Sequence, residues 1–123
     1  MIQGTVNAML EPIVEVNVGR LGEQTIPVQA IVDTGFNDYL TLPSATVAQL
    51  DLPLAMPTEA TLADDRVVQA NCYRARVTWD GQEREIPVLA FEAGPFVGTA
   101  LMRGYEWSAE MVQNGRLVLR RLS

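Results

Sequence analysis

The chain has 123 residues, 48% hydrophobic and 20% charged, which suits a single globular domain over residues 1–123 with one core. Its formal net charge is −6 at pH 7 and it has no long basic run, which excludes nucleic acid and anionic membrane surfaces as expected partners. No stretch approaches about 18 uninterrupted apolar residues, and the start "MIQGTVNAMLEP" lacks the pattern of a secretory signal. We therefore expect no membrane association and a cytoplasmic location.

Several residue types that carry chemistry are missing. The chain has no histidine and no lysine, since all nine basic residues are arginine. This excludes serine or cysteine hydrolysis through a histidine base, Schiff-base chemistry and a P-loop. Cys72 is the only cysteine, so an internal disulfide and a structural zinc site are excluded, and a reducing cytoplasm suits it. We expect no metal and no cofactor, and the acid–base groups of an enzyme of this kind must be carboxylates or tyrosines.

The first half of the chain is typical of β-structure. Alternation on both sides of Glu11-Pro12 predicts two strands near residues 4–9 and 12–18. In the next strand, within residues 22–33, apolar side chains share one face until Ile31-Val32 makes its end apolar on both faces. Such an end belongs in the middle of the molecule. A short strand follows over residues 38–43.

Helical spacing in "SATVAQLDL" then predicts a short helix that begins at Ser44, its expected cap. Further strands are predicted from period-two alternation and turn signals. They comprise a hairpin with its tip near Asp64-Asp65, strands over 73–79 and 84–91 joined by the tight turn "WDGQ", the pair Phe96-Val97, a short helical stretch near Ala100–Arg103, and strands over 105–112 and 116–122 joined by a turn at Asn114-Gly115.

The stretch "QAIVDTGFNDYLTLP" ends an apolar run in the carboxylate of Asp33. Hydrolysis without a metal or a nucleophilic side chain needs one carboxylate to take a proton from water and a second, protonated one to give a proton to the substrate carbonyl. Two carboxyl groups held close share one proton, which provides both roles in one site. Thr34 can brace such a loop, and Gly35 lets neighbouring backbone approach the carboxylates. These three residues are the candidate catalytic set.

The segment "IVDTGFNDYLTLP" resembles the active-site segment of retropepsin-like aspartic proteases, in particular small bacterial and archaeal members with Asp-Thr-Gly-Phe. Further on, "PFVGTALM" resembles that family's apolar pair followed by glycine and a short helix, which packs beneath the catalytic loop. The hairpin around "TLADDRVV" stands where the family has its flap. The resemblance covers roughly residues 10–120 and implies a mostly β, closed acid-protease barrel with one or two short helices. It implies substrate contacts from Phe36, Leu62, Ala63, Asp64 and Asp65.

The resemblance also implies an assembly. The chain contains one Asp-Thr-Gly, while the chemistry needs two facing carboxylates, so it must pair with itself around a two-fold axis between two copies of Asp33. The substrate is then a peptide or protein segment, held as an extended strand beneath the flap. Phe36 departs from the family pattern, because retroviral members usually carry alanine or serine there. Thr99 also departs from the family pattern. Retroviral members often carry arginine there, and their ion pair near the two-fold axis cannot form with threonine.

Other residues in these segments have simpler interpretations. Asp38 is expected to be a solvated loop residue, and Gly98 to serve close backbone packing. Cys72 is expected to be half-buried and unreactive, because no histidine or lysine is present to lower its pKa.

The leading hypothesis is a homodimeric aspartic endopeptidase with one Asp33 from each chain. Two alternatives stay open. The first is the same fold kept as an inactive peptide-binding or dimerisation module. The second is an unrelated β-barrel in which Asp-Thr-Gly is only a turn.

Overall fold

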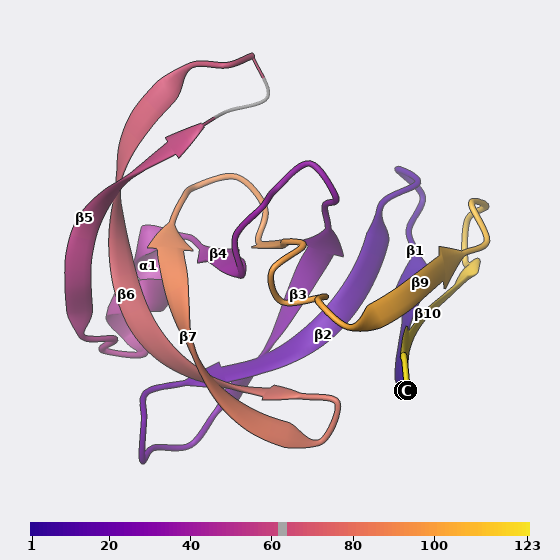
Figure 1. Cartoon of the computed structure of the whole chain (residues 1–123), viewed down its shortest axis with the longest axis horizontal. Coiled ribbons are helices and arrows are strands. Elements are labelled where there is room, and N and C mark those ends of the chain that lie inside the picture. The colour runs from indigo at the N-terminus through magenta and orange to yellow at the C-terminus, as the bar shows by residue number, and fades with distance from the viewer. Residues whose placement is uncertain (62–63) are drawn as a thin grey trace.

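The computed structural model describes residues 1–61 and 64–123. Within these residues the chain is mostly β, with one short helix (Figure 1). The elements are β1 (Ile2–Val6), β2 (Pro12–Gly19), β3 (Ile26–Val32), β4 (Leu40–Leu42), α1 (Ser44–Gln49), β5 (Leu54–Thr61), β6 (Val67–Trp79), β7 (Gln82–Ala90), β8 (Phe96–Val97), β9 (Tyr105–Ala109) and β10 (Arg116–Arg121).

The strands form one sheet that closes on itself. Their order is β5-β6-β7-β4-β8-β3-β2-β1-β10-β9, and an additional pairing joins β6 to β2. That pairing is antiparallel, with Asn17 opposite Thr78 and Gly19 opposite Arg76. It links β6, β7, β4, β8, β3 and β2 into a ring of six strands. The predicted closed barrel is confirmed.

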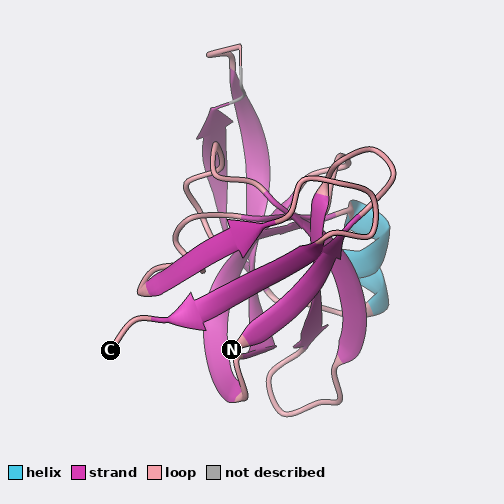
Figure 2. Cartoon of the chain, turned by 90° about the vertical axis from the view of Figure 1, so that its right-hand side faces the viewer, coloured by secondary structure: helices cyan, strands magenta, loops and turns pink. Residues whose placement is uncertain are grey.

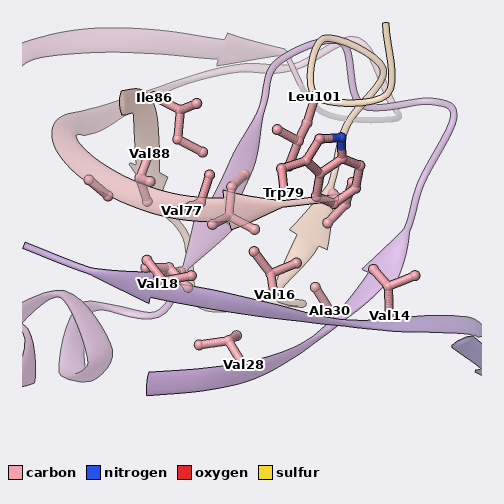
Figure 3. Close-up of a cluster of buried hydrophobic side chains, with 14 of the residues drawn as sticks. Val14, Val16, Val18, Val28, Ala30, Val77, Trp79, Ile86, Val88 and Leu101 are labelled. Atoms are coloured by element: carbon pink, nitrogen blue, oxygen red, sulfur yellow. The ribbon is translucent and has the colours of Figure 1, made fainter. Parts of the chain in front are cut away.

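Side-chain alternation fills the barrel. Along β2, Val14, Val16 and Val18 are buried while Glu15 between them is exposed, as expected for a strand with one face on the core. Figure 3 shows these valines pointing toward side chains from β3, β6 and β7. Trp79 lies among them, with its ring edge-on to Tyr105 at a centroid distance of 6.1 Å. The core sits inside the ring, so it supports every strand that leads to the loops above it.

Two of the predicted hairpins form as expected. Asp80 and Gly81 both have positive φ, so "WDGQ" makes a two-residue turn with Trp79 opposite Gln82. The β5–β6 hairpin brings Thr61 opposite Val67 and rises at the upper left of Figure 1. This hairpin stands at the same end of the molecule as the loop that follows β3.

The predicted helical stretch near Ala100–Arg103 is wrong. Residues 99–104 are consecutive turns, in which the Gly98 carbonyl accepts bonds from the amides of Leu101 (3.2 Å) and Met102 (3.4 Å). Gly104, with a φ of +86°, then redirects the chain into β9. Too few residues lie between Gly98 and Gly104 to extend the first turn into a helix, since one turn alone is unfavourable.

The C-terminal hairpin is real but its turn differs from the prediction. β9 ends at Ala109, so residues 110–112 of the expected strand belong to a loop that runs to Gly115. Asn114 and Gly115 instead extend the pairing to β1, because the Val6 amide donates to the Gly115 carbonyl and the Asn114 amide donates to the Val6 carbonyl. The hairpin turn is therefore displaced by one residue, to Gln113-Asn114, because the Gly115 amide donates to the Val112 carbonyl at 2.8 Å and Asn114 has a φ of +65°.

The sequence predicts that Ser44 caps α1, and this prediction is wrong. Pro43 occupies the cap position and Ser44 begins the helix. The backbone amide and the hydroxyl of Ser44 both donate to Oε1 of Glu92, at 3.1 and 2.6 Å. A carboxylate from a distant loop thus satisfies the helix start, where negative charge is favoured. Both hydrogen bonds lower the pKa of Glu92, and the bond from the hydroxyl has the larger effect.

Substituting Ser44→Ala should raise the Glu92 pKa toward its ordinary value, because the hydroxyl bond stabilises the ionised form. A carboxyl whose pKa is lowered on folding contributes stability above its unfolded pKa and loses it as pH falls through the folded value. The variant should therefore be less stable than the parent at neutral pH, and equally stable below about pH 3. NMR titration and unfolding at the two pH values check this; an unchanged Glu92 pKa contradicts it.

Outside the ring, β1, β10 and β9 form an extension of the sheet. Figure 2 shows this extension facing the viewer, with β9 beyond β10. The Tyr105 hydroxyl donates to Asp80 at 2.9 Å and Arg121 pairs with the same carboxylate at 3.2 Å, so the extension is tied to the β6–β7 turn. No helix in the described part of the chain is long and apolar enough to cross a membrane.

Candidate active site

Asp33 lies at the carboxyl end of β3, where the chain leaves the barrel. β3 is held on one side by antiparallel β2 and on the other by parallel β8, so its end is central, as the apolar pair Ile31-Val32 predicted. The loop that begins at Asp33 passes over β8 and returns as β4 on the other side of β8. The loop that carries the candidate carboxylate is therefore flanked at each end by a buried strand.

Main-chain hydrogen bonds fasten this loop to β8 and to the segment after it. The Asp33 amide donates to the Val97 carbonyl (2.9 Å), and the Gly98 amide donates to the Tyr39 carbonyl (3.0 Å). The Thr99 amide then donates to the Phe36 carbonyl at 2.8 Å. These bonds restrain the loop at both ends and in its middle. The segment "PFVGT" therefore braces the Asp-Thr-Gly loop from beneath, the role that its sequence predicts.

Gly98 makes that close approach possible. A Cβ atom at this position would overlap the carbonyl oxygen of Asp38 and would lie 2.7 Å from both the carbonyl oxygen and the ring of Phe36. No side chain fits there unless the loop moves. The prediction that Gly98 serves backbone packing is confirmed.

The Asp33 side chain is half-buried, and its Oδ1 accepts a hydrogen bond from the Gly35 amide at 2.9 Å. This bond fixes the carboxylate against its own loop. A Cβ at Gly35 would approach that same Oδ1 at 3.2 Å, so glycine keeps the space next to the carboxylate open. Thr34 is exposed, and its hydroxyl makes no hydrogen bond within the part of the chain whose side chains the structure describes. The bracing comes instead from the segment that contains Gly98.

Phe36 and Asp38 occupy the rest of the loop. Phe36 is half-buried because its ring lies over Gly98, so it covers the join between the two segments. Asp38 is exposed, as expected, and its carbonyl accepts a bond from the Ala100 amide at 3.2 Å. Phenylalanine at this position adds an apolar ring to the loop and offers no hydroxyl.

The β5–β6 hairpin carries the remaining predicted contacts. Asp64 and Asp65 are both exposed near its tip, and Asp65 has a φ of +66°. Asp64 pairs with Arg66 at 2.6 Å, which leaves Asp65 as the surplus negative charge. Leu62 and Ala63, also expected to contact substrate, lie outside the described residues.

Cys72 is the one thiol of the chain. Burial raises the pKa of the half-buried Cys72 thiol, and Asp38 adds to this rise, against an opposing effect of Arg74. The thiol therefore stays protonated near neutral pH, which agrees with its expected lack of reactivity. Among the residues that the structure describes, no three His, Cys, Asp or Glu side chains gather as a metal site.

Sequence reasoning missed Thr41 as a positioning residue. It is 4% exposed in the middle of β4, and its hydroxyl accepts a bond from the Phe96 amide at 2.9 Å. Thr41 thus ties β4 to the start of β8, the strand on which the Asp33 loop rests. The signal was a hydroxyl inside the apolar run "YLTLP", because a buried polar group must find a partner.

Comparison with known proteins supports this architecture at the level of the fold. No family model matches the chain, and no curated protein sequence matches it. Among solved structures, EIAV protease complexed with the inhibitor HBY-793 is similar, with a TM-score of 0.59 and 15% sequence identity. The alignment covers 76% of this chain and 86% of EIAV protease, which is a retropepsin.

The chain has a retropepsin-like fold. At this identity the likeness concerns the fold alone. It removes the alternative of an unrelated β-barrel, because the ring, the loop after β3 and the hairpin above it belong to one architecture. The retropepsin-like fold also agrees with the family resemblance of the Asp33 and Gly98 segments.

Proposed function

We propose that the chain is an aspartic endopeptidase that acts as a homodimer, with Asp33 of each copy forming the catalytic pair. The observation that carries the proposal is the placement of a single half-buried carboxylate on a main-chain-braced loop within a retropepsin-like fold. A loop restrained in this way holds a carboxylate still, as acid–base catalysis requires.

In this mechanism one Asp33 is ionised and its twin is protonated. The ionised carboxylate removes a proton from a water molecule held between the two side chains, and that water attacks the peptide carbonyl carbon. The protonated carboxyl donates its proton to the carbonyl oxygen, giving a tetrahedral diol. The C–N bond then breaks as the first carboxyl passes the proton it took from water to the nitrogen, while the second carboxylate takes a proton from a diol hydroxyl and so leaves a carboxylic acid. Thr34 and Gly35 belong to the same loop, and the Gly35 amide keeps Oδ1 of Asp33 in place.

The proposed substrate is an extended peptide held between this loop and the β5–β6 hairpin. Main-chain hydrogen bonds from strand-like segments supply affinity without regard to sequence. Phe36 offers an apolar contact, and the hairpin end at Asp64 and Asp65 covers the peptide. The surplus charge of Asp65, with Asp64 already paired to Arg66, disfavours acidic peptides.

Cleavage should depend on protein concentration, because the site is complete only in the dimer. On dilution below the dimer dissociation constant, activity per chain should fall in proportion to concentration. Peptidase assays over a dilution series, beside sedimentation at the same concentrations, check this. Constant activity per chain in samples shown to be monomeric contradicts the proposal. Added chelator should leave the activity unchanged.

A second candidate is a peptide-binding module of the same fold without turnover. Phe36 favours it, because its ring offers no hydrogen bond to the neighbouring Asp33 carboxylate. This candidate predicts that extended peptides bind without being cleaved at any pH, and that Asp33→Asn leaves their binding unchanged. Any cleavage that is lost in Asp33→Asn excludes it.

A further inference from the structure

Arg84 begins on a buried face of the barrel. It is the third residue of β7 and lies opposite Val77 of β6. Because side chains alternate along a strand, Arg84 shares its face with Ile86 and Val88, which are buried in the core (Figure 3). Arg84 is itself half-buried. A guanidinium that starts from an apolar face needs a partner for its charge.

That partner is not a carboxylate. Seven of the nine arginines form ion pairs with acidic side chains among the described residues, and Arg84 and Arg103 form none. Arg103 is exposed to water, whereas the guanidinium of Arg84 lies over the ring of Tyr39, 6.0 Å from the ring centroid. A cation within about 6 Å of an aromatic face is attracted by the negative charge of that face. The contact between Arg84 and Tyr39 is therefore a cation–π interaction.

Tyr39 is the last residue of the Asp33 loop, immediately before β4. It is half-buried and packs against the core. β4 lies between β7 and β8 in the sheet. The Tyr39 carbonyl accepts a hydrogen bond from the Gly98 amide, just after β8, at 3.0 Å. Tyr39 is thus held from both neighbouring strands, through its ring by Arg84 of β7 and through its carbonyl by Gly98.

We propose that Arg84 is a positioning residue for Asp33 and that it acts through Tyr39. The guanidinium holds the ring of Tyr39, and the ring keeps the Tyr39 carbonyl where the Gly98 amide meets it. This fixes the end of the loop opposite Asp33, whose own end is fixed by the bond from its amide to the Val97 carbonyl. The effect on catalysis rests on the proposed function, whereas the effect on the bond between Tyr39 and Gly98 does not.

The expected size of the effect is modest. A cation–π contact of this kind changes the equilibrium between the held and the open arrangement by about 2- to 5-fold. The main-chain bonds of the loop remain when the contact is lost, so the loop should still form. Its end at Tyr39 should open more often, and the hydrogen bond from the Gly98 amide should break with it.

Arg84→Gln provides the first test, because it removes the cation and keeps a polar side chain. NMR should show hydrogen exchange of the Gly98 amide about 2- to 5-fold faster than in the parent chain. The Val6 amide, which donates to the Gly115 carbonyl in the sheet extension, is the internal reference and should exchange at the parent rate. Arg84→Lys keeps a cation and should recover most of the protection at Gly98.

Tyr39 provides a second test that does not depend on how well Arg84→Gln folds. Tyr39→Phe keeps the aromatic face and should behave like the parent chain. Tyr39→Leu removes that face and should speed Gly98 exchange as Arg84→Gln does, and the double variant should exchange no faster than either single one. The matched control is Arg103→Gln, which removes an arginine that is exposed and also has no ion pair among the described residues. It should leave Gly98 exchange unchanged.

Cleavage gives the catalytic readout. Arg84→Gln should lower kcat by at least the factor seen in Gly98 exchange, and KM should change little, because the loop end affects the placing of Asp33 rather than the binding of the peptide. Arg84→Lys should restore most of kcat. Both are measured at a temperature where all variants are fully folded.

The outcomes separate this inference from the proposed function. Faster Gly98 exchange in a chain that cleaves nothing supports the contact between Arg84 and Tyr39 and rejects the peptidase. Cleavage by the parent, with Gly98 exchange and kcat both unchanged in Arg84→Gln, rejects the inference and leaves the peptidase standing. Equal acceleration of the Gly98 and Val6 amides also overturns it, because Arg84 then contributes only to overall stability. Faster Gly98 exchange with unchanged kcat overturns the positioning role.

Discussion

Asp33→Asn is expected to reduce peptide cleavage by at least about 10²–10⁴-fold, the range that a single acid–base group contributes. An amide neither takes a proton from water nor gives one to a carbonyl oxygen under these conditions. The variant should stay folded, because the amide oxygen of asparagine can still accept the bond that Gly35 donates to Oδ1. Cleavage of an unstructured protein substrate, with thermal unfolding and sedimentation of the same sample, tests both parts.

Asp38→Asn is the matched control. Asp38 lies in the same loop, but it is exposed and the structure uses its backbone carbonyl rather than its carboxylate. This variant should retain nearly full activity. Equal losses in the two variants contradict the assignment of Asp33, as does full activity of Asp33→Asn.

Mixing the parent chain with Asp33→Asn adds a test of the shared site. When equal amounts of the two chains exchange subunits at random, about a quarter of the dimers carry Asp33 in both subunits. About half of all chains carry Asp33. Activity should therefore fall to about a quarter of that of the same total amount of parent chain if the pair is required, and to about half if each chain works alone.

The sequence was sufficient wherever the relevant interactions are local. Period-two alternation located β2 and β6, whose inward side chains bury themselves in the barrel, and the turn Asp80-Gly81 formed as its residue types require. The Asp33 loop was identifiable because its signal combines a polar tripeptide with apolar flanks. Those flanks are expected to be buried because their own residues are apolar.

The failures arise where distant segments meet. The predicted two-residue turn at Asn114-Gly115 is replaced by a longer loop that ends in a Val112–Gly115 turn, with which Val6 pairs. Ser44 is not the cap of its helix, and Glu92 reaches the helix start. The six-stranded ring depends on the pairing of β2 with β6, which no local period encodes. In each case the observed structure contains a contact between residues far apart in sequence.

The site itself was only half predictable. Asp33, Gly35 and Gly98 follow from their residue types, whereas Thr41 became visible only once β4 and β8 were seen to be neighbours. The facing carboxylate that the proposed mechanism needs is a different matter, because in that proposal it belongs to another copy. Its position would depend on how two chains meet, and no local pattern in one chain encodes that.

Gly98→Ala is expected to destabilise the fold by about 1–3 kcal/mol or more, the usual cost of forcing extra atoms into a packed interior. The added methyl group meets backbone carbonyl oxygens of Asp38 and Phe36, which cannot rotate away as a flexible side chain can. The Asp33 loop must therefore shift. Since catalysis depends on placing the carboxylate accurately, activity should fall by more than the stability loss explains, and it should stay low at temperatures where the variant is fully folded.

Two other variants separate the clash from other effects. Thr99→Ala changes an exposed side chain in the same segment and keeps the amide that binds the Phe36 carbonyl, so stability and activity should change little. Gly22→Ala, at a φ of +83° with open space around it, imposes backbone strain of about 1 kcal/mol without a clash and far from the site. It should lower stability while leaving activity intact. If Gly98→Ala behaves like Gly22→Ala, the close approach of the two segments does not position Asp33, and the bracing role assigned to "PFVGT" is wrong.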